Sequence, residues 1–155
     1  MRPFALYLLF ALQAFHVLFL LLHDWIPLGS LNNVAAVRAA NPGRKLLTAT
    51  LISTNFYLFG FAASAVHWNG PYPHWLLWYL LISYLFLFIG ELTAWWIPYF
   101  GRPQPERAAR YQAMFGGTHS LLPARNGIPL NTLHVILHIA TVATLVVIAF
   151  VMAAR

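Results

Sequence analysis

The sequence contains no cysteine and very little charge. Without cysteine there are no disulfides, no thiolate metal ligands and no thiol nucleophile. Only 8% of the residues are charged, whereas soluble domains average about 25%. Apolar residues make up 61% of the chain and aromatic residues 16%. This composition excludes an ordinary soluble domain and indicates a protein that resides in a membrane.

Four long apolar segments predict membrane-spanning helices, at residues 3–24, 45–66, 74–99 and 129–154. Each is long enough to cross a hydrocarbon core of about 30 Å. Because backbone polar groups in lipid must be satisfied within the segment, we expect α-helices. Residues 105–115 begin with a proline and place Ala108, Tyr111 and Phe115 on one face, so they predict a short interfacial amphipathic helix. The predicted fold is an all-α, four-helix transmembrane bundle that forms a single domain over residues 1–155.

Basic residues are concentrated in two of the predicted loops. Seven of the nine Lys and Arg residues lie in or at the edges of these loops: Arg38, Arg44, Lys45, Arg102, Arg107, Arg110 and Arg125. Under the positive-inside rule, this asymmetry places loops 25–44 and 100–128 in the cytoplasm and both termini outside. We therefore expect a multi-pass protein of a bacterial-type inner membrane or its equivalent. The net charge of +6 reflects this topology and attraction to anionic membrane lipids, not a nucleic-acid partner.

Helical spacing places the polar residues of the predicted spans in one layer. A rise of 1.5 Å per residue sets His16, Asn55, Glu91 and His138 at depths of about 10 to 13 Å from the loop side. An ionisable residue in a membrane helix costs about 2.5–3.5 kcal/mol, so such residues usually face the bundle interior or a watery cavity. The sequence therefore predicts a polar pocket between the helices, open to the cytoplasmic half.

The polar layer suggests an acid-base site. Glu91 is the expected central acid or base, with His134 and His138, which share one helical face, as its catalytic partners. A substrate or ligand that reaches this depth is expected to be lipid-like: an isoprenoid, sterol-like or acyl compound. The sequence leaves open whether the protein is an enzyme or a binding protein.

Four further residues are expected to support the ligand. Asn55 and Asn131 are predicted to hydrogen bond to the polar groups of the site. His119 and Arg125, in the last loop, are predicted to close the pocket or to hold an anionic head group.

Other functions use the same residues. His16, His134, His138 and Glu91 form a nitrogen and oxygen set suited to zinc or iron, and His16 with His138 would serve as axial ligands of a haem. A chain of Glu and His is also typical of a proton or ion pathway, which in so small a protein requires a homo-oligomer. A membrane subunit that binds a partner helix is the remaining hypothesis.

Overall fold

The computed structural model describes residues 2–154, and its fold is all-α. The elements are α1 (Arg2–Leu22), the 3-10 turn η1 (Gly29–Leu31), α2 (Val34–Ala40), α3 (Gly43–Val66), α4 (His74–Glu91), the π-helical turn η2 (Leu92–Trp96), α5 (Ile97–Phe100), α6 (Pro105–Phe115) and α7 (Thr132–Ala153). In this part of the chain, four helices are long and apolar enough to cross a membrane: Phe4–Leu22, Gly43–Val66, His74–Phe100 and Thr132–Ala153. The predicted fold class is confirmed, and each predicted span ends within three residues of the observed one.

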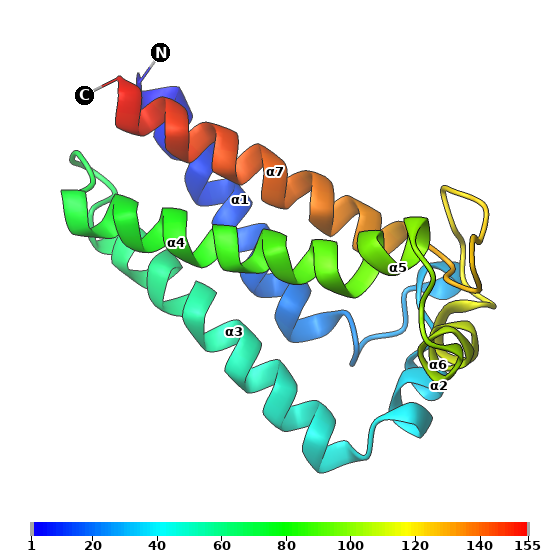
Figure 1. Ribbon diagram of the computed structural model, residues 1–155. Helices are drawn as coiled ribbons and strands as arrows, with labels where there is room; N and C mark the ends of the chain where they lie inside the picture. The colour runs from blue at the N-terminus through cyan, green and yellow to red at the C-terminus, as the bar shows by residue number, and fades with distance from the viewer. Residues whose placement is uncertain (1, 155) are drawn as a thin grey trace.

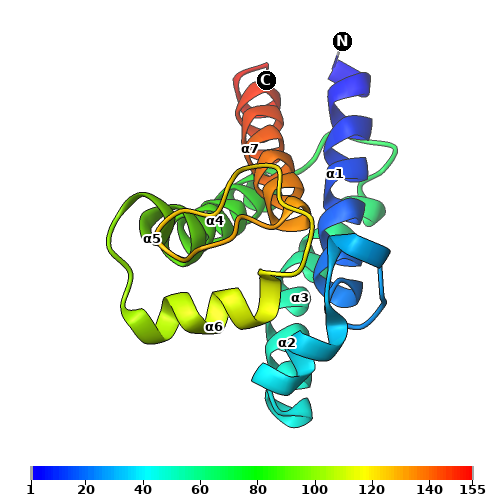
Figure 2. The same cartoon turned by 90° about the vertical axis from the view of Figure 1, so that its right-hand side faces the viewer.

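The four long helices form a bundle in which each of them packs against two others. α7 packs against α1 and α4, while α3 packs against α1 and α4. The two ends of the chain lie at one end of the bundle, and α2, α5 and α6 lie at the opposite end, called the loop end below (Figure 1). There α6 lies crosswise to the long helices and contacts α2 (Figure 2).

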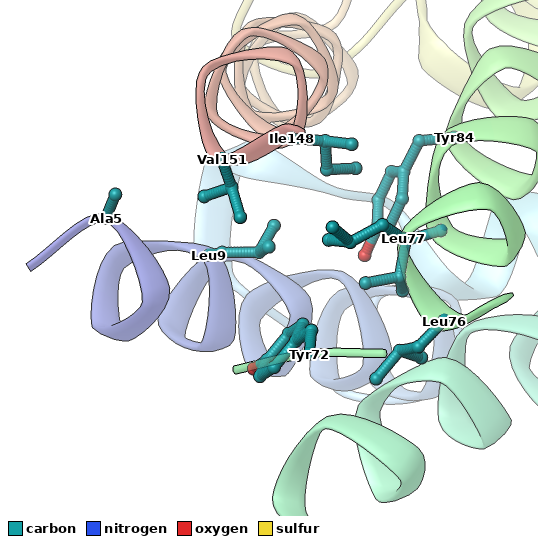
Figure 3. Close-up of a cluster of buried hydrophobic side chains, with 9 residues drawn as sticks. Ala5, Leu9, Tyr72, Leu76, Leu77, Tyr84, Ile148 and Val151 are labelled. Atoms are coloured by element: carbon teal, nitrogen blue, oxygen red, sulfur yellow. The ribbon is translucent and has the colours of Figure 1, made fainter. Parts of the chain in front are cut away.

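Apolar cores at both ends of the bundle stabilise it, and a smaller cluster of Phe19, Leu133 and Leu137 joins α1 to α7. The core near the chain ends joins α1, α4 and α7 through residues such as Leu9, Leu77 and Ile148 (Figure 3). The loop-end core joins α2, α3, α6, α7 and the end of the third span, with Trp95 and Phe115 among its members. Buried polar residues of α4 and α7, among them Glu91, His138 and Thr141, lie between these two cores. Apolar side chains therefore pack on both sides of the polar residues.

The short amphipathic helix predicted at residues 105–115 is confirmed as α6, and its predicted apolar face packs on the loop-end core. Pro98 has no N–H, so the carbonyl of Ala94 lacks its helical donor. The Tyr111 hydroxyl donates to this carbonyl at 2.8 Å, and the Arg107 guanidinium donates to the carbonyl of Thr93 at 3.4 Å. The proline in the third span thereby leaves the Ala94 carbonyl as an acceptor that holds α6 in place, and the Thr93 carbonyl adds a second one.

The segment between α6 and α7 is fixed by a tight turn. Asn126 and Gly127 have φ angles of 53° and 74°, the left-handed values that an Asn-Gly hairpin turn requires. The Asn126 amide donates to the carbonyls of Tyr99 at 2.9 Å and Gly101 at 2.6 Å. A Cβ at Gly127 would lie only 2.9 Å from the Cβ of Ala108 on α6. The turn is therefore held against both α5 and α6.

Asn131 sets the start of α7, which begins three residues later than predicted. Its Oδ1 accepts from the backbone N–H groups of Leu133 at 2.9 Å and His134 at 3.3 Å, as an N-cap does. Its Nδ2 donates to the Leu31 carbonyl and to Thr118 Oγ1, both at 2.7 Å. One buried amide thus joins the first loop, the last loop and the fourth span.

Replacing Asn131 with alanine is expected to destabilise the protein by about 1–3 kcal/mol, because the helix loses its cap and a buried carbonyl loses its donor. Thermal or SDS-induced unfolding in detergent measures the effect. Asn55→Ala is the matched control, since the Asn55 side chain is exposed on α3. Equal stability of the two variants would contradict the capping role.

Candidate functional site

A buried polar chain joins three of the four long helices. It consists of His16 on α1, Thr141 on α7 and Glu91 at the end of α4, called the buried triad below. Their exposed fractions are 0%, 0% and 5%. Nε2 of His16 lies 3.1 Å from Oγ1 of Thr141, and this hydroxyl oxygen lies 2.7 Å from Oε1 of Glu91. The predicted burial of His16, Glu91 and His138 in the bundle interior is confirmed.

His138 lies beside the triad and is held by a tryptophan. The Trp96 indole N–H donates to Nδ1 of His138 at 3.1 Å. Because an indole nitrogen only donates, Nδ1 carries no proton and the ring proton is on Nε2. Within residues 2–154, this Nε2 and Oε2 of Glu91 have no hydrogen-bond partner, although both atoms are buried.

The π-helical turn η2 explains how Trp96 reaches α7. The N–H of Ile97 bonds to the carbonyl of Leu92, five residues earlier. In this geometry residues five apart face nearly the same side, whereas in an α-helix they do not. Glu91 and Trp96 can therefore both face α7 from one continuous helix.

His134 lies nearer the loop end and outside the triad. Its ring packs on that of Trp95, with centroids 4.2 Å apart, and its Nδ1 lies 3.3 Å from Oδ1 of Asn131. The structure therefore does not give Glu91 the two partners expected on the last span. The hydrogen-bonded neighbour of Glu91 is Thr141, whose significance the sequence analysis missed.

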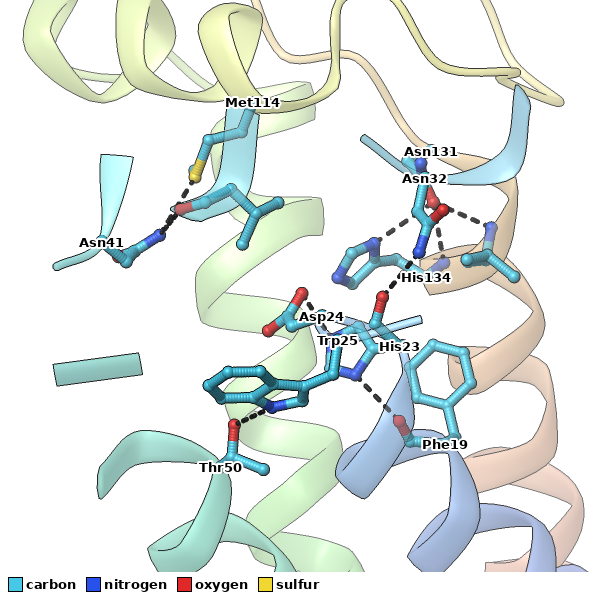
Figure 4. Close-up of polar contacts among 12 residues, drawn as sticks. Phe19, His23, Asp24, Trp25, Asn32, Asn41, Thr50, Met114, Asn131 and His134 are labelled. Atoms are coloured by element: carbon cyan, nitrogen blue, oxygen red, sulfur yellow. Dashed lines mark hydrogen bonds and ion pairs between the residues drawn. The ribbon is translucent and has the colours of Figure 1, made fainter. Parts of the chain in front are cut away.

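A pocket of about 720 Å³ opens at the loop end, between the end of α1, the start of α3, η2 and α6. His134, His23 and Asp24 contribute to its polar lining, and the His23 and His134 rings lie 5.7 Å apart (Figure 4). Trp95 and Phe115 add apolar surface. The triad does not line this pocket, so the predicted single pocket is instead an open pocket and a separate buried cluster.

His23 and Asp24 form an ion pair on the wall of the pocket. Nδ1 of His23 donates to the carbonyl of Phe19 at 2.8 Å, and Nε2 lies 3.3 Å from Oδ1 of Asp24 (Figure 4). Burial raises the pKa of Asp24, and the neighbouring His23 partly lowers it. Next to them, the Trp25 indole donates to Thr50 on α3 at 3.1 Å, which ties this wall to a second span.

The opposite wall carries two arginines of α6, Arg107 and Arg110. Both guanidinium groups donate to uncharged oxygens: Arg107 to the Thr93 carbonyl and Arg110 to the side-chain amide oxygen of Asn41. Among the side chains of residues 4–154, His23 and Asp24 form the only ion pair, so neither guanidinium has a carboxylate partner there. Arg107 and Arg110 are three residues apart, and this spacing was the available signal in the sequence that they share a face of the helix.

His119 and Arg125 do not line the pocket, although they were expected to close it or to bind a head group. Nδ1 of His119 lies 2.7 Å from Oγ1 of Thr132, which fixes the imidazole in the last loop. The guanidinium of Arg125 lies 5.5 Å from the ring centre of Phe100, on the outside of α5. Both side chains hold the loop in place.

Asn55 was expected in the polar layer, but its side chain is exposed. The buried face of α3 contains the small residues Thr50, Thr54, Gly60 and Ser64. A Cβ at Gly60 would lie 2.8 Å from a terminal methyl group of Leu80, so the glycine lets α3 and α4 pack closely there. Small residues allow helices in a membrane to approach closely, and this packing turns Asn55 outward.

The metal and haem hypotheses gain no support from this geometry. Within residues 2–154, no three His, Asp or Glu side chains are grouped so that they could hold a metal ion. Both ring nitrogens of His16 already have hydrogen-bond neighbours, the Leu12 carbonyl and Thr141. No protein-family model, curated protein or solved structure matches this chain.

Asp24→Asn is expected to stabilise the protein at about pH 7 more than at about pH 4. The folded state raises the pKa of Asp24 above its ordinary value of 3.8, so it binds this proton more tightly than the unfolded chain does. Wild-type stability therefore falls as the pH rises from 3.8 through the raised pKa, and the substitution removes that loss.

Thermal unfolding in detergent at the two pH values measures this difference. Glu106→Gln, which removes an exposed carboxyl on α6, is the control. A stability gain for Asp24→Asn that is the same at both pH values would contradict the raised pKa of the Asp24 carboxyl.

Proposed function

We propose that the protein binds a lipid-like amphiphile with an anionic head group. The observation that carries this proposal is the loop-end pocket, whose lining combines Trp95 and Phe115 with Arg107 and Arg110, two arginines that have no carboxylate partner within the described residues. An apolar groove of about 500 Å³ lies between α3 and α4. A charged head and an apolar chain would occupy these two places.

The arginines favour a phosphate or carboxylate head group. Guanidinium groups bind such anions through paired, charge-assisted hydrogen bonds, which are stronger than neutral ones. Arg107 and Arg110 lie about one turn apart on α6 and line the same pocket. On the opposite wall, burial raises the pKa of Asp24, so this carboxyl repels an anion less than a fully ionised one would.

The groove suits an acyl or isoprenyl chain. Its lining includes Phe56 on α3 and Phe86 on α4. Leu46 and Ala49 line the pocket, and Ser53 and Phe56 line the groove. These four α3 residues are spaced by three and four, so one helical face runs from the pocket to the groove. α3 diverges from α4 towards the loop end (Figure 1), and three of these residues, Ala49, Ser53 and Phe56, are exposed.

The proposed orientation places the loop end in the cytoplasm. Seven of the nine Lys and Arg residues belong to the two segments at that end, as the positive-inside rule describes. Anionic lipids of the cytoplasmic leaflet attract basic segments near the membrane surface. In a bacterial-type inner membrane or its equivalent, the pocket would then lie at the depth of the lipid head groups, and the ligand would enter from the side.

The double variant Arg107→Gln with Arg110→Gln is expected to weaken binding of phosphatidylglycerol about tenfold or more, since a hydrogen bond to a charged group contributes about 1.5–3 kcal/mol. Binding is measured by tryptophan fluorescence or calorimetry with the lipid in non-ionic detergent, and phosphatidylcholine serves as the neutral comparison. Trp95 in the pocket makes fluorescence a suitable signal.

The matched control is Arg102→Gln with Arg125→Gln, which removes the same charge at the same end of the bundle but outside the pocket lining. It is expected to retain most of the affinity. Equal losses in the two double variants, or equal binding of the two lipids by the wild type, would show that the pocket is not a head-group site.

A further inference from the structure

Thr141 has one hydroxyl proton but three polar neighbours that can accept it. One is the carbonyl of Leu137, one turn earlier on α7, at 3.0 Å, and the other two belong to other helices. Oγ1 of Thr141 lies 2.7 Å from Oε1 of Glu91 and 3.1 Å from Nε2 of His16, and both distances are those of hydrogen bonds. Each hydrogen bond needs a proton between its two heavy atoms. The hydroxyl supplies only one of the two protons that are needed.

The second proton is not available from a neutral His16 beside an ionised Glu91. Nδ1 of His16 lies 2.7 Å from the Leu12 carbonyl, which only accepts, so the proton of a neutral imidazole is on Nδ1. Its Nε2 then presents a lone pair to Thr141. If Glu91 is also ionised, one of the two contacts brings two lone pairs together, which is repulsive. The geometry therefore requires one additional proton in the triad.

We propose that the buried triad shares this additional proton between Glu91 and His16 through the Thr141 hydroxyl. In one state the Glu91 carboxyl donates to Oγ1, and Thr141 donates to Nε2 of His16. In the other state the Glu91 proton has moved to Oγ1 while the hydroxyl proton has moved to Nε2, which leaves a carboxylate and an imidazolium. Two protons move, no other bond changes, and the net charge of the triad stays the same.

The surroundings favour a triad with no net charge. The Tyr84 ring lies 4.9 Å from that of His16, and Tyr57 on α3 lies 5.4 Å from Tyr84. On α7 the neighbouring titratable group is His138, whose Nδ1 is occupied by the Trp96 N–H. None of these neighbours brings a full charge, and an unpaired charge is costly in a membrane bundle.

Oε2 of Glu91 gives the triad an atom through which to exchange its proton. It is buried and has no hydrogen-bond partner within residues 2–154. A water or ligand group that reaches this oxygen can donate a proton to it and later take that proton back, while the proton on Oε1 moves to Oγ1 of Thr141 and the hydroxyl proton moves to Nε2 of His16. The triad is thus an intramembrane acid-base site, and it is separate from the proposed head-group pocket.

The test measures the protonation of both ends of the triad in detergent without added lipid. The carbonyl stretching band of a protonated carboxyl reports on Glu91, and Glu91→Gln identifies it. Nitrogen NMR of histidine-labelled protein reports on His16, and His16→Gln identifies its signals. Because no lipid is present, this result does not depend on whether the loop-end pocket binds an anionic head group.

Near neutral pH, the fraction of protonated Glu91 and the fraction of His16 imidazolium in the wild type are expected to add up to one. A neutral His16 together with an ionised Glu91 would overturn the proposal. This measurement needs only the folded wild-type protein to decide the question, so it stands even if a variant fails to fold.

Thr141→Val removes the hydroxyl and is expected to uncouple the two groups, so that their signals change at different pH values. Thr144→Val is the matched control, because Thr144 is equally buried on α7 and its hydroxyl donates to the Ala140 carbonyl at 2.8 Å. The signals should change together in the wild type and in Thr144→Val. Signals that still change together in Thr141→Val would overturn the role of the hydroxyl.

Discussion

The hydrogen bonds of Thr141 are the interaction on which the arrangement of the bundle depends. They connect α7 to α1 through His16 and to α4 through Glu91, at a level where apolar cores exclude water on both sides. A buried polar group without a partner is strongly unfavourable in such surroundings. Once these three side chains meet, the facing sides of α1, α4 and α7 are fixed, and α3 completes the bundle through its small residues.

The same requirement shapes the loop end, where backbone groups need partners. Pro98 frees the Ala94 carbonyl, and Tyr111 of α6 satisfies it. Asn131 caps α7 and binds the first loop. These bonds hold α6 away from the end of α1 and leave the pocket between them. The bundle thus combines a closed polar cluster in its interior with an open amphipathic pocket at its end.

The sequence predicted the features that follow from composition and helical period: the four spans, the amphipathic α6, and the burial of His16, Glu91 and His138. It did not predict α2, whose few residues give only a weak signal. Trp96 was missed because regular α-helical spacing turns it away from Glu91, and the π-helical turn changes that spacing. Asn55 was misplaced because polarity suggested burial, whereas close packing at Gly60 decided which face of α3 points inward. Which residues on different helices meet depends on such packing and cannot be derived from one helix at a time.

The central claim is that His16 and Glu91 interact through Thr141 although they belong to different helices. A double-mutant cycle tests this most directly, with His16→Phe and Glu91→Met replacing each polar group by an apolar one of similar size. Unfolding of the wild type, both single variants and the double variant in detergent gives the coupling energy. The account predicts a coupling of about 0.5–3 kcal/mol, as found for residues of one hydrogen-bond network. Effects that add to within about 0.3–0.5 kcal/mol would contradict it.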